Sequence, residues 1–153
     1  MNKPILVLGI CLSSLMSCGH EDQVPQKVLT AFHQKFPQAK DVEWELEKED
    51  DMEWEAEFNV NDMEYSANFD PEGTWHETEH DIKFHEIPPI VISTIQHDFA
   101  DSDFKKAEIS ETPKGQFYEI ELIQGETEIE LTLNDKGEIT YKVTTLEEEE
   151  YEN

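Results

Sequence analysis

The sequence has few basic residues. Lysine and arginine together number 11, against 37 aspartate and glutamate residues, and the formal net charge is -26 at pH 7. Nucleic acid is therefore excluded as a natural partner, because a phosphate backbone attracts clustered lysine and arginine. Glycine is also scarce, with 6 residues and no phosphate-binding loop motif. Aromatic residues are not scarce, and the 8 Phe, 4 Tyr and 3 Trp indicate a folded core rather than an acidic disordered chain.

Cysteine occurs only twice, and both residues lie within the first 18 positions. The apolar run at 5–12 has the length of a signal-peptide core and is too short to span a bilayer. Residues 15–18, Leu-Met-Ser-Cys, resemble a bacterial lipobox, which implies cleavage before Cys18 and lipidation of Cys18. We therefore expect a lipoprotein signal peptide at 1–17 and a lipidated cysteine with a polar tether at 18–23.

These features predict a location in the cell envelope, with the protein lipid-anchored to a membrane and facing the periplasm or the cell surface. The strong negative charge would repel anionic lipid head groups, so we expect membrane contact through the lipid anchor only. An ordinary secretory signal with an incidental cysteine is the alternative.

Apolar residues at helical spacing occur twice, at a constant offset of 63 residues. The two sets are Val24, Val28, Leu29, Phe32 and Phe36, and Ile87, Val91, Ile92, Ile95 and Phe99. Each run opens on proline, which suits the first turn of a helix. The pattern predicts two helices that end near Phe36-Pro37 and near Phe99.

After each predicted helix the apolar period changes to two, which is typical of strands with one apolar and one polar face. We expect strands around 43–47, 53–58, 65–69 and 74–79, and again at 104–111, 117–123, 127–133 and 139–145, with turns at 70–73 and 134–137. The prediction is an α+β fold, a tandem duplication of a helix plus a four-stranded antiparallel meander, with the helices packed on one sheet face. The predicted domains are a first unit at 24–82, a second unit at 83–146 and an acidic tail at 147–153.

This pattern resembles the PepSY-like, beta-lactamase-inhibitor-like family of secreted or lipid-anchored bacterial proteins. The resemblance rests on the helix starts at Val24-Pro25 and Ile87-Pro88, the helix exit Phe36-Pro37-Gln38-Ala39, the strand Trp54-Glu55-Ala56-Glu57-Phe58, and the turns at 70–73 and 134–137. In the second copy Ala100-Asp101-Ser102 replaces the Pro-Gln-Ala exit. The resemblance implies two PepSY-like units that form a binding or inhibitory module.

Glutamates gather on the predicted sheet face away from the helices. They are Glu43, Glu45, Glu47, Glu53, Glu55, Glu57, Glu119, Glu121, Glu126, Glu128 and Glu130. Opposed like charges destabilise a sheet, so this face either tolerates the cost for the sake of solubility or recovers it from cations.

We interpret the face as a docking surface for an unidentified basic or cation-bearing protein. Its candidate binding residues are Glu43, Glu45, Glu53, Glu55, Glu57, Glu119, Glu121, Glu128 and Glu130. The alternative is binding or buffering of a divalent cation such as calcium. Tyr65 and Trp75 are either aromatic anchors of this surface or core residues.

Two histidines are candidate metal ligands. His76 and His80 would point to the same side of a strand, so a zinc or copper site is conceivable there; a polar strand end is the alternative. The sequence contains no Gly-x-Ser-x-Gly motif and no cofactor motif. We therefore expect a protein that is not an enzyme and has no cofactor other than a possible calcium ion.

Overall fold

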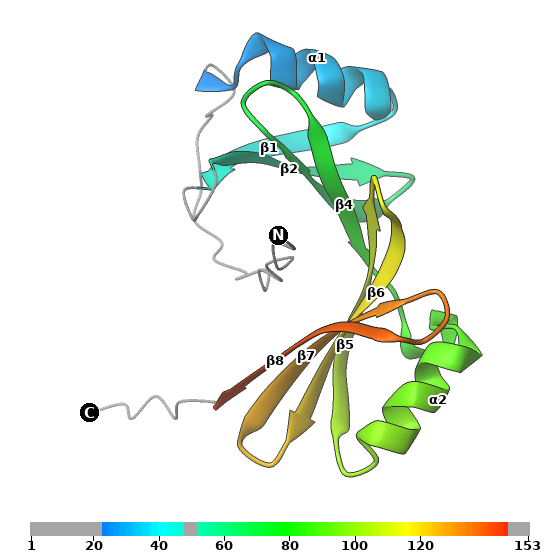
Figure 1. Ribbon diagram of the computed structural model, residues 1–153. Helices are drawn as coiled ribbons and strands as arrows, with labels where there is room; N and C mark the ends of the chain where they lie inside the picture. Colours follow the sequence, from blue (N-terminus) through cyan, green and yellow to red (C-terminus); the bar gives the residue numbers. More distant parts are fainter. Residues whose placement is uncertain (1–22, 48–51, 147–153) are drawn as a thin grey trace. The chain divides into compact units, whose positions relative to one another are not determined.

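The computed structural model of the chain describes residues 23–47 and 52–146 (Figure 1). Helix α1 (Gln26–Lys35) is followed by strands β1 (Lys40–Glu47), β2 (Glu53–Val60), β3 (Met63–Phe69) and β4 (Trp75–Asp81). The 3-10 helix η2 (Phe84–Glu86) and helix α2 (Pro89–Asp98) then precede β5 (Asp103–Thr112), β6 (Gly115–Gln124), β7 (Thr127–Asn134) and β8 (Ile139–Leu146).

The eight strands form one sheet, in which the strand order follows the sequence from β1 to β8. The predicted fold class is therefore wrong. The structure is dominated by a single eight-stranded antiparallel sheet with two short α-helices of 10 residues each, rather than by a duplicated helix plus four-stranded meander with packed helices. Strands pair through backbone N–H and C=O groups, which they carry whatever their side chains are. The alternation of side chains is the same in an edge strand and in an internal strand, so the pattern did not reveal this continuation.

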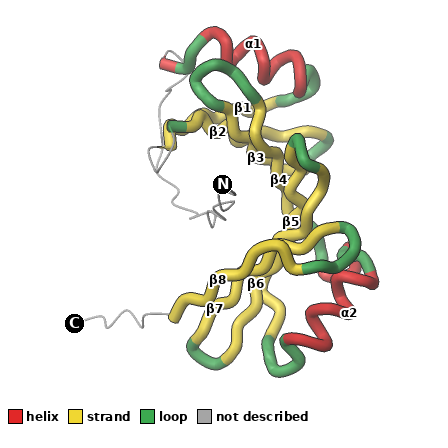
Figure 2. The backbone as a smooth tube through the Cα atoms, viewed as in Figure 1, coloured by secondary structure: helices red, strands yellow, loops and turns green. Residues whose placement is uncertain are grey.

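The chain divides into two compact units. The N-terminal unit contains the described residues up to 80 together with 110–115, and the C-terminal unit contains 81–109 and the described residues from 116 onward. Short loops, drawn in green in Figure 2, join β2 to β3, β3 to β4, β6 to β7 and β7 to β8.

The core of the N-terminal unit is rich in aromatic residues. The buried Phe32 ring of α1 lies 5.1 Å from the Trp44 ring, 5.1 Å from Phe58 and 6.2 Å from Phe69, between ring centroids. All three contacts are edge-to-face, an arrangement that adds about 0.5–1.5 kcal/mol per pair beyond burial of the area. Through Phe32, helix α1 therefore packs against aromatic residues of β1, β2 and β3.

Tyr65 and Trp75 pack against the same cluster of buried residues. The Lys35 ammonium lies 3.4 Å from the Trp75 ring centroid, and the Trp75 indole N–H donates to Thr78 Oγ1 at 2.8 Å. The Tyr65 ring stacks on the Phe58 ring with their centroids 5.8 Å apart, so both Tyr65 and Trp75 are half-buried members of the core.

The core of the C-terminal unit is mainly aliphatic. Val91 and Ile95 of α2 are buried with the strand residues Ile120, Leu122, Ile129, Leu131 and Leu133. The helical residues lie four apart, which places them on one face of α2. The two units therefore bury their helices with different chemistry.

Both helices begin after proline and end where the sequence predicts. Pro25 and Pro88 precede the first helical residues, and their carbonyl groups accept from the amides of Leu29 and Ile92. The last turns close with the amide of Phe36 on Phe32 and the amide of Phe99 on Ile95, at 2.8 and 2.9 Å. The predicted helix ends are confirmed.

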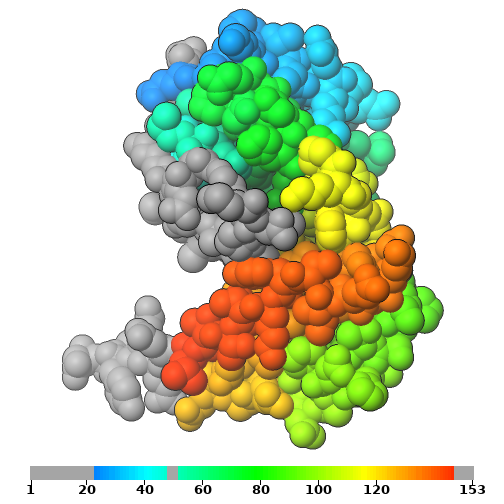
Figure 3. All heavy atoms as spheres, viewed as in Figure 1, coloured from blue at the N-terminus to red at the C-terminus, as the bar shows by residue number. Residues whose placement is uncertain are grey.

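The turn at 70–73 lies close to α1. Gly73 has a φ of +85°, and a Cβ atom there would lie 2.7 Å from the carbonyl oxygen of Lys27. Figure 3 shows the green atoms of this turn against the blue atoms of α1. Only glycine fits a position with both a positive φ and so close a neighbour.

Several predictions concern residues outside the described ranges. These are the signal peptide at 1–17, the lipidated Cys18 and the acidic tail at 147–153. Of the helices in the described part of the chain, none has the length and apolar character needed to cross a membrane.

Candidate functional site

Strands β1 and β2 place glutamate opposite glutamate at three successive positions of one face. The pairs are Glu43 with Glu57, Glu45 with Glu55, and Glu47 with Glu53. Directly opposed residues have Cβ atoms about 4.5–5.5 Å apart, and like charges in this arrangement are destabilising by up to about 1 kcal/mol per pair. The predicted glutamates of the first half of the chain are therefore brought together.

The rows formed by these pairs continue across β3 and β4. The Glu45–Glu55 row continues through Asn68 to Glu77. The Glu43–Glu57 row continues through Ser66 to Glu79. We call this surface the acidic face; its members are Glu43, Glu45, Glu47, Glu53, Glu55, Glu57, Ser66, Asn68, Glu77 and Glu79.

The carboxylates of the acidic face repel one another. Burial, followed by the charges of Glu47, Glu57 and Glu45, raises the pKa of Glu55 from 4.5 to about 7. Burial and the neighbouring carboxylates Glu64, Glu43 and Glu45 also raise the pKa of Glu57. Glu55 is therefore a mixture of the protonated and ionised forms at neutral pH.

Four glutamates of the acidic face have no cationic partner within residues 23–47 and 52–146. Glu43, Glu45, Glu55 and Glu57 form no ion pair there with lysine or histidine. Three of them, Glu43, Glu45 and Glu57, are exposed to solvent. The repulsion among these four glutamates is therefore not compensated by a cation in the part of the chain that the structure describes.

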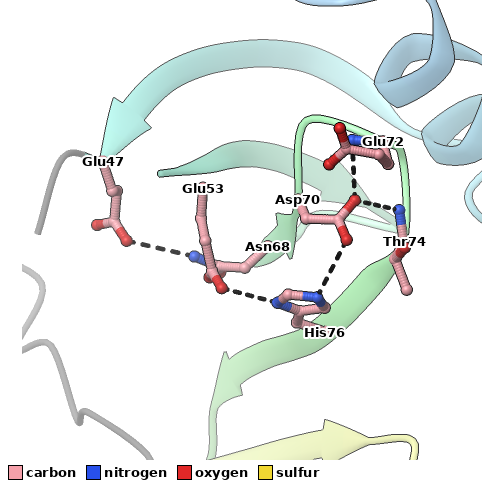
Figure 4. A network of polar contacts seen from close by, with 7 residues as sticks. All are labelled: Glu47, Glu53, Asn68, Asp70, Glu72, Thr74 and His76. Carbon is pink, nitrogen blue, oxygen red and sulfur yellow. Dashed lines mark hydrogen bonds and ion pairs between the residues drawn. The ribbon is translucent and has the colours of Figure 1, made fainter. Parts of the chain in front are cut away.

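His76 lies at one end of the acidic face, between two carboxylates (Figure 4). Its Nδ1 is 2.7 Å from Glu53 Oε1, and its Nε2 is 3.7 Å from Asp70 Oδ2. Asp70 also accepts the backbone N–H groups of Glu72 and Thr74, at 3.0 and 2.8 Å.

Burial raises the pKa of Asp70, but the hydrogen bonds from Thr74 and Glu72 and the nearby His76 outweigh it, so the pKa is lowered overall. Asp70 therefore stays ionised beside His76. At this end of the face, therefore, Glu53 and Asp70 have a histidine as their partner.

The structure does not bring His76 and His80 together as two ligands of one metal. His76 contacts Glu53 and Asp70, whereas the His80 ring lies 4.9 Å from the Tyr65 ring, between centroids. The register of β4 shifts by one residue, because Glu77 pairs with Asn68 while Trp75 pairs with Phe69. An extra residue in a strand breaks the alternation on which the metal-site hypothesis depends.

The predicted glutamates of the second half of the chain have different surroundings. Glu121 and Glu130 are also directly opposed, on β6 and β7. Here Lys105 intervenes, with its Nζ 3.4 Å from Glu121 Oε2 and 2.5 Å from Glu128 Oε1.

Burial and the charges of Glu121 and Glu128 raise the pKa of Glu130, and Lys105 opposes the increase. Of the remaining two predicted glutamates, Glu119 is buried at 4% exposure, and Glu126 is exposed in the β6–β7 turn. The second set of glutamates is thus mostly compensated or buried.

Sequence reasoning missed the two lysines that form ion pairs with carboxylates of the C-terminal unit. Lys105 serves Glu121 and Glu128, and Lys106 Nζ lies 3.2 Å from Asp81 Oδ1 and 3.0 Å from Glu108 Oε1. The signal was the adjacent pair itself, because neighbouring residues in a strand point to opposite faces. One lysine therefore reaches each side of β5.

Sequence reasoning also missed four residues of the acidic face: Ser66, Asn68, Glu77 and Glu79. Counting by twos from Trp75 puts Glu77 and Glu79 on the apolar side of β4. The register shift at His76 instead aligns them with Asn68 and Ser66. The signal was the cost of placing carboxylates against an apolar core, which favours a bulge at this point.

Both halves of the chain match one known protein family. The family described as "Putative beta-lactamase-inhibitor-like, PepSY-like" matches residues 19–66 and 52–141. No curated protein shows significant similarity to the chain.

Solved structures from three Bacteroides species have the same fold. A DUF2874 family protein from Bacteroides uniformis is 21% identical with a TM-score of 0.70, covering 78% of this chain and 88% of that one. A protein from Bacteroides eggerthii described as "putative periplasmic" is 19% identical with a TM-score of 0.70, covering 79% and 88%. A BLIP-like protein from Bacteroides fragilis is 18% identical with a TM-score of 0.70, covering 84% and 92%. Together with the family match over most of the sequence, these likenesses mean that the chain belongs to the PepSY-like, beta-lactamase-inhibitor-like family.

Proposed function

We propose that this chain is a non-catalytic, lipid-anchored protein of the cell envelope that binds a basic segment of a protein partner through its acidic face. One observation carries the proposal: β1 and β2 oppose glutamates at three successive positions. Four of these glutamates have no cationic partner among the described residues. Positive charge supplied by a partner would reduce the repulsion between these carboxylates and so favour binding.

The family and its solved relatives support the class and the location. The family description names inhibitor-like proteins, which act by binding, and one solved relative is described as periplasmic. Inhibition of a secreted enzyme is one form that such binding can take. Hydrolase assays with an excess of the protein test that form directly.

The anchor is proposed on the lipobox-like residues 15–18. Wild-type protein should remain with membranes after a salt wash and should incorporate a labelled fatty acid. The Cys18→Ser variant should do neither. Labelling of the variant would contradict lipidation at this residue.

Charge reversal on the two units tests the binding surface. Crosslinking in the intact envelope should capture a basic partner with the wild-type protein, and Glu55→Lys should weaken capture by about tenfold or more, because it adds repulsion where the partner needs attraction. Glu130→Lys is the matched control, since it also reverses a half-buried, opposed glutamate, but in the unit that already contains Lys105. Equal capture by all three proteins would refute the acidic face as the binding surface.

A second candidate function is binding of a divalent cation such as calcium. The specific observation is the direct opposition of Glu45 and Glu55 on neighbouring strands, which offers two carboxylates, the oxygen ligands that calcium prefers. Millimolar calcium should raise the melting temperature beyond sodium chloride of equal ionic strength. Equal shifts with the two salts would eliminate this candidate.

A further inference from the structure

Ser66 is a buried hydroxyl without a hydrogen-bond partner on the acidic face. It is 5% exposed, and its Oγ makes no hydrogen bond within the described part of the chain. In the register it lies opposite Glu57 on β2 and opposite Glu79 on β4, so its side chain shares their face. Native proteins rarely leave such a group unsatisfied, which points to a ligand that supplies the missing bond.

The groups around Ser66 define the chemistry of that ligand. Ionised carboxylates only accept hydrogen bonds, and the serine oxygen can accept as well. A lysine ammonium or an arginine guanidinium carries several donors, no acceptor and a positive charge. Such a group satisfies Ser66 and at the same time relieves the repulsion that Glu57 experiences from Glu64, Glu43 and Glu45.

The spacing of the rows defines the shape of the ligand. The row through Ser66 and the row through Asn68 are two residues apart along β3. Two residues of a strand advance about 6.6–6.8 Å, and an extended peptide has the same step. Basic residues at alternate positions of an extended segment therefore meet successive rows.

On the basis of the proposed function, we infer that the partner presents an extended segment with basic residues at alternate positions. One cationic group lies over Ser66 between Glu57 and Glu79, and the next lies over the row that contains Glu45, Glu55 and Glu77. This inference assigns the register and the anchor point of the partner, beyond the attraction of charge alone.

Two peptide isomers test the inference on the full chain, purified in detergent. One is an alternating Lys-Ser heptapeptide with three lysines, and the other has the same composition with its three lysines adjacent. The alternating isomer should bind wild-type protein about tenfold more tightly, the lower end of what one additional charge-assisted hydrogen bond in register contributes. Ser66→Ala should abolish this preference.

Ser102→Ala is the matched control, because the Ser102 hydroxyl also lacks a hydrogen-bond partner within residues 23–47 and 52–146 but belongs to the C-terminal unit. This control should keep the preference. Loss of the preference in both variants would overturn the assignment of Ser66.

The remaining outcomes separate this inference from the proposed function. Equal binding of the two isomers, with both weakened by Glu55→Lys, overturns the inference and leaves the proposed function standing. Absence of binding by either isomer overturns the inference, and the envelope crosslinking then decides the proposed function. Tighter binding of a helical peptide with lysines four residues apart also overturns the extended geometry.

If Ser66→Ala does not fold, the binding site can be located on the wild-type protein from changes in its amide chemical shifts. Titration with the alternating isomer should shift the amides of Glu57, Ser66 and Glu79. Shifts confined to β6, β7 and β8 would overturn the site.

Discussion

Both units place glutamate opposite glutamate, but among the described residues only the C-terminal unit pairs these glutamates with a lysine. Glu121 and Glu130 are opposed across β6 and β7, and Lys105 lies 3.4 Å from Glu121 and 2.5 Å from Glu128. Glu45 and Glu55 are opposed across β1 and β2 and have no such partner within the described ranges. An acidic sheet face is thus a candidate binding surface only where the fold does not neutralise it.

After the helices the offset between the two halves is 64 residues, as between Gly73 and Gly137 of the two turns, and residues at this offset sharpen the contrast. Glu57 corresponds to Glu121, and both are opposed by an acidic or polar residue of the next strand, Ser66 or Glu130. On the fourth strand, Glu77 and Glu79 correspond to Tyr141 and Val143. The N-terminal unit therefore extends its carboxylates over four strands, whereas β8 ends the acidic rows of the C-terminal unit.

Among variants that test the difference between the two units, Glu55→Gln should change the free energy of unfolding most. Because the folded-state pKa of Glu55 is raised to about 7 from 4.5, the folded protein holds a proton that the unfolded chain releases between these values. Stability contributed by this group is complete below pH 4.5 and is lost as the pH rises through 7. Glutamine imitates the protonated form, so the variant should be more stable than wild type by about 1–3 kcal/mol at pH 8 and nearly equal to it near pH 4.5.

Urea denaturation at several pH values between 4.5 and 8 measures this difference. Glu121→Gln is the control, because it removes a carboxylate that Lys105 attracts. It should give no gain at pH 8. A gain of equal size in both variants would erase the distinction between the units.

The next effect comes from removing the cation of the C-terminal unit. Lys105→Met should leave Glu121, Glu128 and Glu130 in the same unrelieved state as the N-terminal glutamates. A loss of about 0.5–1.5 kcal/mol is expected, since the lysine is half exposed and solvent screens its ion pairs. Thermal or urea unfolding at low ionic strength measures the loss.

Lys114→Met serves as the reference for this variant. Lys114 is exposed, and its side chain takes part in no ion pair of the described residues. It should change the stability by less than about 0.5 kcal/mol. If both lysine variants unfold at the same urea concentration, Lys105 is not what distinguishes the two units.

The smallest effect is the reverse experiment, in which a cation is added to the N-terminal unit. Glu57→Lys converts the Glu43 pair from repulsive to attractive and should stabilise the protein by about 0.3–1 kcal/mol. The gain should shrink in 1 M sodium chloride, because salt screens exposed charges. Glu126→Lys in the β6–β7 turn is the control, and a gain as large there would indicate a general effect of lower net charge.

Part of the candidate site was predictable from the sequence. The alternation of Glu43, Glu45, Glu53, Glu55 and Glu57 with apolar residues correctly indicated that these side chains share one sheet face. Alternation fixes which face a residue occupies, but not which residue lies opposite it, so the direct pairing required the register of β1 and β2.

Two features lay beyond the sequence pattern for physical reasons. The extra residue in β4 at His76 reverses the alternation, and this separates His76 from His80 and adds Glu77 and Glu79 to the acidic face. The joining of all strands into one sheet depends on backbone hydrogen bonds, which every residue except proline can form regardless of its side chain.

The proton on Glu55 gives the face a measurable signature. At neutral pH about half of the molecules carry that proton, and a cationic group in the neighbouring row would expel it. The heat measured on binding would then depend on the ionisation enthalpy of the buffer, in proportion to the number of protons released. At acidic pH more carboxylates of the acidic face would be protonated, and its affinity for a basic partner would be lower. The fraction of the protein with bound partner would therefore fall as the pH falls.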